Sequence, residues 1–160
     1  MKNQILEIIE KDSKLTAEQI AVMTGNSVEV VEKCIADMEN EGIILGYNAV
    51  INWERTEKEA VQALIEVNVT PQRSEGFDKV AERIYRFPEV TDCYLMSGGF
   101  DLTVVIEGMT MKEVALFVAE KLAPIDCVVG TATHFVLKKY KDKGVIFEKG
   151  NRDEREAIVL

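Results

Sequence analysis

The chain has 160 residues, of which 47% are hydrophobic and 29% charged, and its formal net charge is −9 at pH 7. This length allows one domain or two small ones, and the composition is typical of a globular protein. The acidic balance argues against a surface that is basic overall, as a protein that coats DNA or membranes needs, but it allows a local basic patch. The sequence has no run of about 18 apolar residues, and charged side chains interrupt residues 1–11, where a signal peptide would lie. We therefore expect a cytoplasmic protein without a membrane partner.

Residue types that hold metals or act as nucleophiles are scarce. The three cysteines, Cys34, Cys93 and Cys127, are widely spaced and form no CxxC pair, which is typical of reduced thiols in a cytosolic protein. His134 is the only histidine, so a His-based metal site or a catalytic triad has too few members. We expect no catalytic residues, no metal site and no enzyme activity.

Three helices are predicted in the first 41 residues. Residues 2–11 place isoleucines at helical spacing. Thr16, with a glutamine three positions later, forms a capping-box pattern that starts a second helix. Gly25 ends that helix, because glycine tolerates left-handed backbone angles. Ser27 is a favourable N-cap for the third helix.

The next segment is predicted to hold a small wing and a linker. Residues 43–51 are mostly apolar and favour two short strands around Gly46 and Tyr47. A helix-turn-helix preceded by a helix and followed by such a wing gives a winged-helix outline. A plain helical bundle with a hairpin has the same spacing. Residues 53–60 break the apolar pattern and are charged, so we expect a linker there.

From residue 61 onward the periodicity switches repeatedly between strand and helix. Residues 61–70 show the period of two of a half-buried strand, and residues 75–87 carry apolar side chains on one helical face. Further strands are expected over 89–96, after the following bend up to 108, and over 126–137, with a second helix over 110–122. This order is the βαββαβ plan of a ferredoxin-like domain, in which two helices cover one face of a four-stranded antiparallel sheet. In the strand after the bend, the alternation places four apolar residues on one face: Phe100, Leu102, Val104 and Ile106. In the last strand, five residues are expected to share one face: Val129, Thr131, Thr133, Phe135 and Leu137.

The other face of this sheet is expected to need a cover. Leu64 and Val105 lie on strand faces that are otherwise polar. A second copy of the chain is the simplest cover for such side chains.

A glycine pair and an acidic residue mark the bend before the third strand. Ser97, Gly98 and Gly99 precede Asp101. Glycine pairs suit a tight connection, because they adopt backbone angles that other residues avoid. A loop with free backbone amides and a nearby carboxylate also has the groups that hold a small zwitterion. An ordinary hairpin and a ligand site are both compatible with these residues.

Several stretches together resemble the Lrp/AsnC (feast/famine) family of bacterial and archaeal transcription regulators. The resemblance extends to about residue 147 and rests on the order and spacing of three motifs. The motifs are the segment from Val31 through Met38 and Glu39 to Gly46-Tyr47, the bend Gly98-Gly99-Phe100-Asp101, and the strand Thr131-x-Thr133 with Phe135-Val136-Leu137.

The resemblance implies an α+β protein with a winged helix-turn-helix DNA-binding domain at 1–52 and a linker at 53–60. A ferredoxin-like effector-binding and dimerisation domain at 61–147 and a tail at 148–160 would follow. It further implies double-stranded DNA, an amino-acid effector and self-association into a homodimer or an octamer as partners, with no other cofactor. The effector would lie between subunits at Ser97, Gly98, Gly99 and Asp101. Asp101 would then either hold the α-amino group or cap the hairpin.

The third helix departs from the family pattern in its charge. The DNA-binding residues implied by the resemblance are Ser27, Glu29, Glu32, Lys33 and Tyr47, and this helix has Cys34 where the family usually places an arginine. Residues 1–52 contain four lysines and nine acidic residues, a net charge of −5. Phosphate contacts normally use cations or backbone donors, so two functions stay open. The chain is either a DNA-binding regulator modulated by an amino acid, or a small-molecule sensor or assembly module with weak or lost DNA binding.

Overall fold

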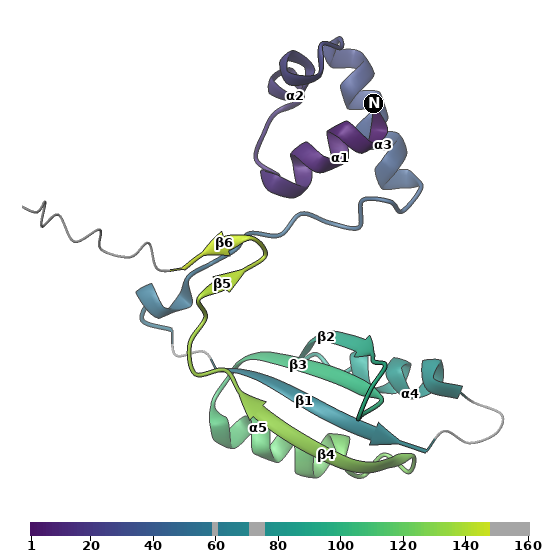
Figure 1. Cartoon of the computed structure of the whole chain (residues 1–160), viewed down its shortest axis with the longest axis vertical. Coiled ribbons are helices and arrows are strands. Elements are labelled where there is room, and N and C mark those ends of the chain that lie inside the picture. The colour runs from purple at the N-terminus through teal and green to yellow at the C-terminus, as the bar shows by residue number, and fades with distance from the viewer. Residues whose placement is uncertain (59–60, 71–75, 148–160) are drawn as a thin grey trace, which may run out of the picture. The chain divides into compact units, whose positions relative to one another are not determined.

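The computed structural model describes residues 1–58, 61–70 and 76–147 (Figure 1). The chain divides into two compact units, Met1–Val50 and Ile51–Leu160. Each unit has its own cluster of buried hydrophobic side chains. No helix among the described residues is both long enough and apolar enough to cross a membrane.

The first unit contains the three expected helices, α1 (Lys2–Lys11), α2 (Ala17–Thr24) and α3 (Val28–Asn40). Thr16 starts α2 with both bonds of a capping box, one from the backbone N–H of Gln19 and one to its side chain. The helices pack through six buried residues, which are Ile5, Ile20, Ala21, Val31, Cys34 and Met38.

The expected wing strands around Gly46 and Tyr47 are wrong. Residues 43–52 form no strand. The chain leaves α3 through two bonds to the carbonyl of Met38, which the N–H groups of Ile43 and Ile44 donate. Beyond this point Leu45 is 92% exposed. A hairpin here would have no core on which to bury an apolar face, so the alternation of residue types does not produce a strand pair.

The second unit holds a four-stranded antiparallel sheet of order β2-β3-β1-β4. Its strands are β1 (Val61–Val69), β2 (Val90–Leu95), β3 (Leu102–Met109) and β4 (Val128–Phe135). Its helices are α4 (Gly76–Tyr85) and α5 (Met111–Phe117), which continues as a π-helical turn over Val118–Leu122. Both helices lie on one face of the sheet (Figure 1), which confirms the ferredoxin-like plan. A short 3-10 helix, η1 (Trp53–Arg55), precedes the sheet, and a small hairpin of β5 (Lys141–Asp142) and β6 (Val145–Ile146) follows it.

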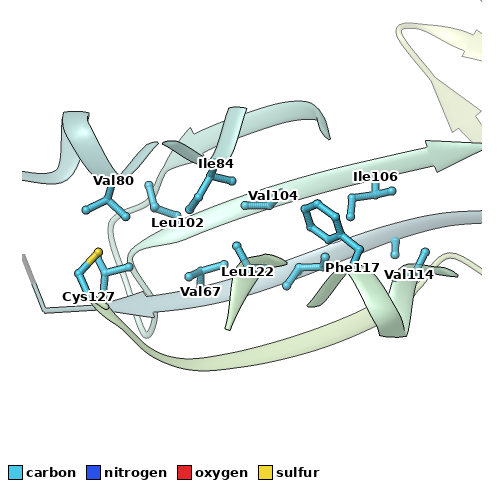
Figure 2. Close-up of a cluster of buried hydrophobic side chains, with 13 residues drawn as sticks. Val67, Val80, Ile84, Leu102, Val104, Ile106, Val114, Phe117, Leu122 and Cys127 are labelled. Atoms are coloured by element: carbon cyan, nitrogen blue, oxygen red, sulfur yellow. The ribbon is translucent and has the colours of Figure 1, made fainter. Parts of the chain in front are cut away.

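The core of the second unit lies between the helices and the sheet (Figure 2). Leu102, Val104 and Ile106 are fully buried on the inner face of β3 and meet Ile84 of α4 and Phe117 of α5. Burying a side chain of this size stabilises the fold by roughly 1.5–3 kcal/mol. The apolar face predicted for the third strand is therefore the face that holds the two helices.

A β-bulge changes the faces of the last strand. Asn68 pairs with Gly130 and Val69 pairs with Val128, so Val129 is an extra residue opposite β1. Val129 is 66% exposed, whereas Phe135 packs against the core. The expectation that Val129 shares a face with Phe135 is wrong, because one inserted residue reverses the alternation. Leu137 lies beyond the end of β4 and is 89% exposed, so it is not part of that face either.

No helix of the described residues lies over the outer face of the sheet. Leu64 on the central strand β1 is 38% exposed there, next to its cross-strand partner Val105. On the same face His134 Nε2 lies 3.1 Å from Glu66 Oε1. Apolar side chains and a polar pair therefore lie together on the open side of the sheet.

The capping box of α2 predicts a measurable loss of stability. Thr16→Ala removes the side-chain acceptor for the Gln19 N–H and should lower the free energy of unfolding by about 1 kcal/mol. Thr16→Ser keeps the hydroxyl and should recover most of this loss. Urea unfolding followed by far-UV circular dichroism measures both variants. An equal loss in the serine variant would show that the hydroxyl is not the stabilising group.

Candidate functional site

The exposed surface of α3 is the candidate nucleic-acid interface. Helical periodicity turns Val31 and Met38 into the core and leaves Glu29, Glu32 and Lys33 exposed on other sides of the helix. Ser27, predicted to contact DNA, is the N-cap. Its hydroxyl oxygen accepts from the Val30 N–H at 3.4 Å. The first turns of α3 therefore bring together four of the five residues implied by the resemblance.

Two acidic residues make this surface locally negative. A hydrogen bond from its own backbone N–H, and then one from the Ser27 hydroxyl, hold the pKa of the Glu29 carboxyl below its usual range. Glu29 is therefore ionised at neutral pH, and it lies in the first turn of α3, where the helix dipole favours an anion. A carboxylate here can accept from the amino group of cytosine in the major groove, but it repels phosphates.

The first unit has few cations, and they differ in whether an acidic side chain already pairs with them. Lys2 Nζ lies 2.9 Å from Glu41 Oε2, and this hydrogen bond raises the pKa of Lys2. In contrast, the Lys33 ammonium has no ion pair within the described part of the chain. Lys33 is therefore the cation on α3 that a phosphate can reach.

Tyr47 lies apart from the other four predicted DNA-binding residues. Its hydroxyl donates to Glu39 Oε1 at 2.8 Å, near the C-terminal end of α3. Burial and this hydrogen bond raise the pKa of Tyr47. The bond fixes the segment after α3 against the helix end opposite to Glu29, so Tyr47 does not belong to the same patch.

The bend between β2 and β3 is the candidate effector site. Ser97, Gly98 and Gly99 are exposed there, and Gly98 has φ +150°, which side chains rarely adopt. The Met96 N–H closes the bend by donating to the carbonyl of Asp101 at 2.8 Å. The structure thus brings the four predicted effector residues into one short loop.

Asp101 connects this loop to the neighbouring strand. Its backbone N–H donates to the carbonyl of Val67, and its Oδ2 accepts from the Val69 N–H at 2.8 Å. The carboxylate therefore satisfies a backbone donor at the end of β1. This contact supports the structural alternative for Asp101 over a direct contact to a ligand's amino group.

A cavity lies elsewhere, at the opposite end of the sheet. It has a volume of about 610 Å³, and residues 96–101 do not line it. Its lining includes Trp53 and Lys58 from the expected linker, together with Gln62 and Glu107 from strand ends. The sequence analysis does not predict this cavity. Trp53 is the only tryptophan of the chain and lies in a charged segment. Such a residue is the signal in the sequence that could have indicated the cavity.

A helix-turn-helix unit followed by a ferredoxin-like unit with a candidate ligand loop defines a class, the DNA-binding regulators that carry a ligand-binding domain. Residues 2–44 match the model of a winged helix-turn-helix DNA-binding domain, and residues 62–146 match that of the Lrp/AsnC ligand binding domain. The chain belongs to the Lrp/AsnC family of transcription regulators. It is accordingly a regulator and not an enzyme.

Several relatives match most of the length of this chain. An HTH-type transcriptional regulator of Bacillus subtilis, YugG, is 50% identical over 158 residues, which are 98% of this chain and 95% of that protein. The regulator LrpA of Pyrococcus horikoshii is 31% identical over 137 residues, 86% of this chain and 94% of LrpA. A transcriptional regulator of Neisseria meningitidis, solved as a complex with L-Met, shares the fold with a TM-score of 0.72. It is 23% identical, and the match covers 88% of this chain and 90% of that one.

The contact between Asp101 and β1 predicts that the bend depends on this carboxylate. Asp101→Ala leaves the Val69 N–H without its charged acceptor and should lower the free energy of unfolding by about 1–3 kcal/mol. Asp101→Asn keeps an acceptor oxygen and should lose clearly less. Urea unfolding followed by Trp53 fluorescence measures both. Equal stability of the alanine variant and the unmodified protein would rule out a structural role for Asp101.

Proposed function

We propose that this regulator binds specific double-stranded DNA through the first turns of α3, and that an amino acid bound at the Ser97–Asp101 bend modulates this binding. The observation that carries the first part is the exposed Lys33 on a helix-turn-helix helix, whose ammonium forms no ion pair with any described residue. The proposed site of action is the cytoplasm, where the DNA lies.

Charges on α3 define how the DNA contact would work. Lys33 would neutralise a phosphate, and the Ser27 end of the helix would point its backbone donors at another. Glu29 and Glu32 would accept from cytosine amino groups in the major groove. Because one unit offers so few cations, its affinity for DNA would be low, and linked copies of the unit would raise it by multivalency.

The outer face of the sheet is the proposed surface of self-association. Leu64 and Val105 lie at its centre, and no helix of the described chain covers them. Two copies packed through this face would bury both sides and form a homodimer with a self-complementary interface. Dimers would then assemble into larger rings such as an octamer, as the resemblance implies.

The bend is the proposed effector site because it offers free donors in an exposed loop. The backbone N–H groups of Ser97, Gly98 and Gly99 donate to no backbone acceptor within the described residues. Successive free N–H groups form a favourable site for a carboxylate. The L-Met complex of the Neisseria regulator supports an α-amino acid as the class of ligand.

DNA binding is tested by mobility shifts on the chain's own upstream region. The unmodified protein should shift this fragment at micromolar concentration or below, with an affinity that falls as salt is added. Lys33→Ala should weaken binding and reduce the logarithmic salt slope by about 1 for each bound subunit. Lys112→Ala, the same charge change on a helix of the second unit, is the control. If no genomic fragment is shifted even at low salt, the sensor alternative replaces the regulator.

Effector binding is tested by thermal unfolding with each proteinogenic amino acid. At least one should raise the melting temperature, since a ligand at 100 times its Kd stabilises the folded state by about 2.7 kcal/mol. Gly98→Val should abolish this rise, because a valine cannot adopt the backbone angle of Gly98 without strain. Gly46→Ala, a glycine replacement in the first unit, should keep it. A complete set of amino acids without any rise would contradict an effector site at the bend.

A further inference from the structure

The cavity of the second unit lies far from the bend. Its lining contains Val61 and Gln62 at the start of β1 and Glu107 and Gly108 near the end of β3. The bend precedes the first residue of β3. A strand rises about 3.3 Å per residue, so roughly 20 Å of strand separate Asp101 from Glu107. The cavity is therefore a separate place on the molecule.

Lys58 supplies a cation that no carboxylate of the described residues neutralises. Its ammonium lies 4.3 Å from the centre of the Trp53 ring. Gly108 faces it, and a Cβ at this glycine would lie 3.8 Å from Lys58 Nζ. Gly108 also has φ +84°. The backbone here leaves room beside the ammonium that a larger residue would fill.

Lys139 and Asn52, two further polar residues of the cavity lining, differ in their partners. Lys139 is neutralised, because its Nζ lies 3.1 Å from Glu107 and 3.6 Å from Asp142, and Gln62 also donates to Glu107. In contrast, Asn52 Oδ1 is buried and has no hydrogen-bond partner among the described residues. A buried acceptor of this kind is costly unless a donor meets it.

Acidic and apolar residues also line the cavity. Glu54 and Glu57 add negative charge on the connector side of the cavity. Apolar surface comes from five residues, which are Ile51, Trp53, Val61, Val136 and Phe147. A ligand that fits this lining has a carboxylate for Lys58, a protonated amine for Glu54 and Glu57, and an apolar body. Cavities of about 300–1,000 Å³ are the usual size for small-molecule ligands.

We propose that this cavity is a second small-molecule site, which binds an apolar α-amino acid as a zwitterion. It goes beyond the effector site at the bend and does not depend on it. Its wall includes Ile51–Lys58, the segment that directly follows the first unit in the chain. The ligand therefore contacts the connector between the DNA-binding unit and the sheet.

Trp53 makes this proposal directly testable, because it is the only tryptophan and lies in the cavity wall. The full-length protein is titrated with L-leucine, L-isoleucine, L-valine, L-methionine and L-phenylalanine up to about 10 mM, while Trp53 emission is recorded. At least one should change the emission in a saturable way. The matching 2-oxo acid, which lacks the ammonium, and the matching amine, which lacks the carboxylate, should bind at least about tenfold more weakly.

Two variants and a control assign the signal to the cavity. Lys58→Met keeps the length of the side chain but removes the cation and should weaken binding at least about tenfold. Lys112→Met, the same change at an exposed lysine outside the cavity lining, should bind as the unmodified protein does. Gly98→Val, which disrupts the bend, should leave the change in Trp53 emission intact.

Three results would overturn the proposal. One is no change in Trp53 emission with any of the five amino acids. Another is a change that persists in Lys58→Met but disappears in Gly98→Val, which would place the ligand at the bend. The third is a Trp53 emission that changes with protein concentration and not with ligand concentration, which would show that a second copy of the chain fills the cavity. The effector site at the bend is tested independently. A ligand-induced rise in melting temperature that is lost in Gly98→Val and kept in Lys58→Met comes from binding at the bend alone.

Discussion

Two helices cover only one face of a four-stranded sheet, and the second unit is built under this constraint. Ile65 and Val104 are fully buried beneath α4 and α5, whereas Leu64, next to Ile65 in the chain, points to the open side. Val105 is only 7% exposed there, because its strand neighbours shelter it without a covering layer. An apolar patch at the centre of an open sheet is a surface for a partner. This patch is therefore the surface that we propose for self-association.

The charge of the first unit makes such association more important. Lys33 is the cation available on α3, and Glu29 remains ionised beside it. Most of the affinity of proteins for DNA comes from neutralised phosphates, so one copy of this unit binds through few favourable charges. Two linked copies act at a high effective concentration and recover the missing affinity without new contacts. In the proposed function, the acidic helix would therefore supply the specificity for DNA, and assembly through the open sheet would supply the affinity.

The sequence predicted those features that depend on neighbouring residues. Thr16 forms the capping box with Gln19 that the sequence predicts, and this signal lies within four residues. The apolar alternation of β3 likewise predicted its buried face. Features that depend on distant residues were missed or misplaced. The bulge that turns Val129 outward is set by pairing with β1, and the bond between Asp101 and Val69 joins residues 32 positions apart. The cavity was missed for the same reason, because its walls come from four separate stretches of chain.

The engagement of Asp101 also limits how an amino acid can be recognised at the bend. Its Oδ2 already accepts from Val69, so the loop is held to β1 by the carboxylate that a ligand's ammonium would otherwise meet. What the loop still offers is backbone N–H groups at Ser97, Gly98 and Gly99, and these match the carboxylate end of an amino acid. An amino group bound there requires an acceptor from outside the loop. In the proposed dimer, a subunit packed on the outer face of the sheet would supply this acceptor. In the proposed function, effector binding at the bend and assembly through the sheet would therefore favour each other, because a ligand bound between two subunits would stabilise the contact that completes its own site.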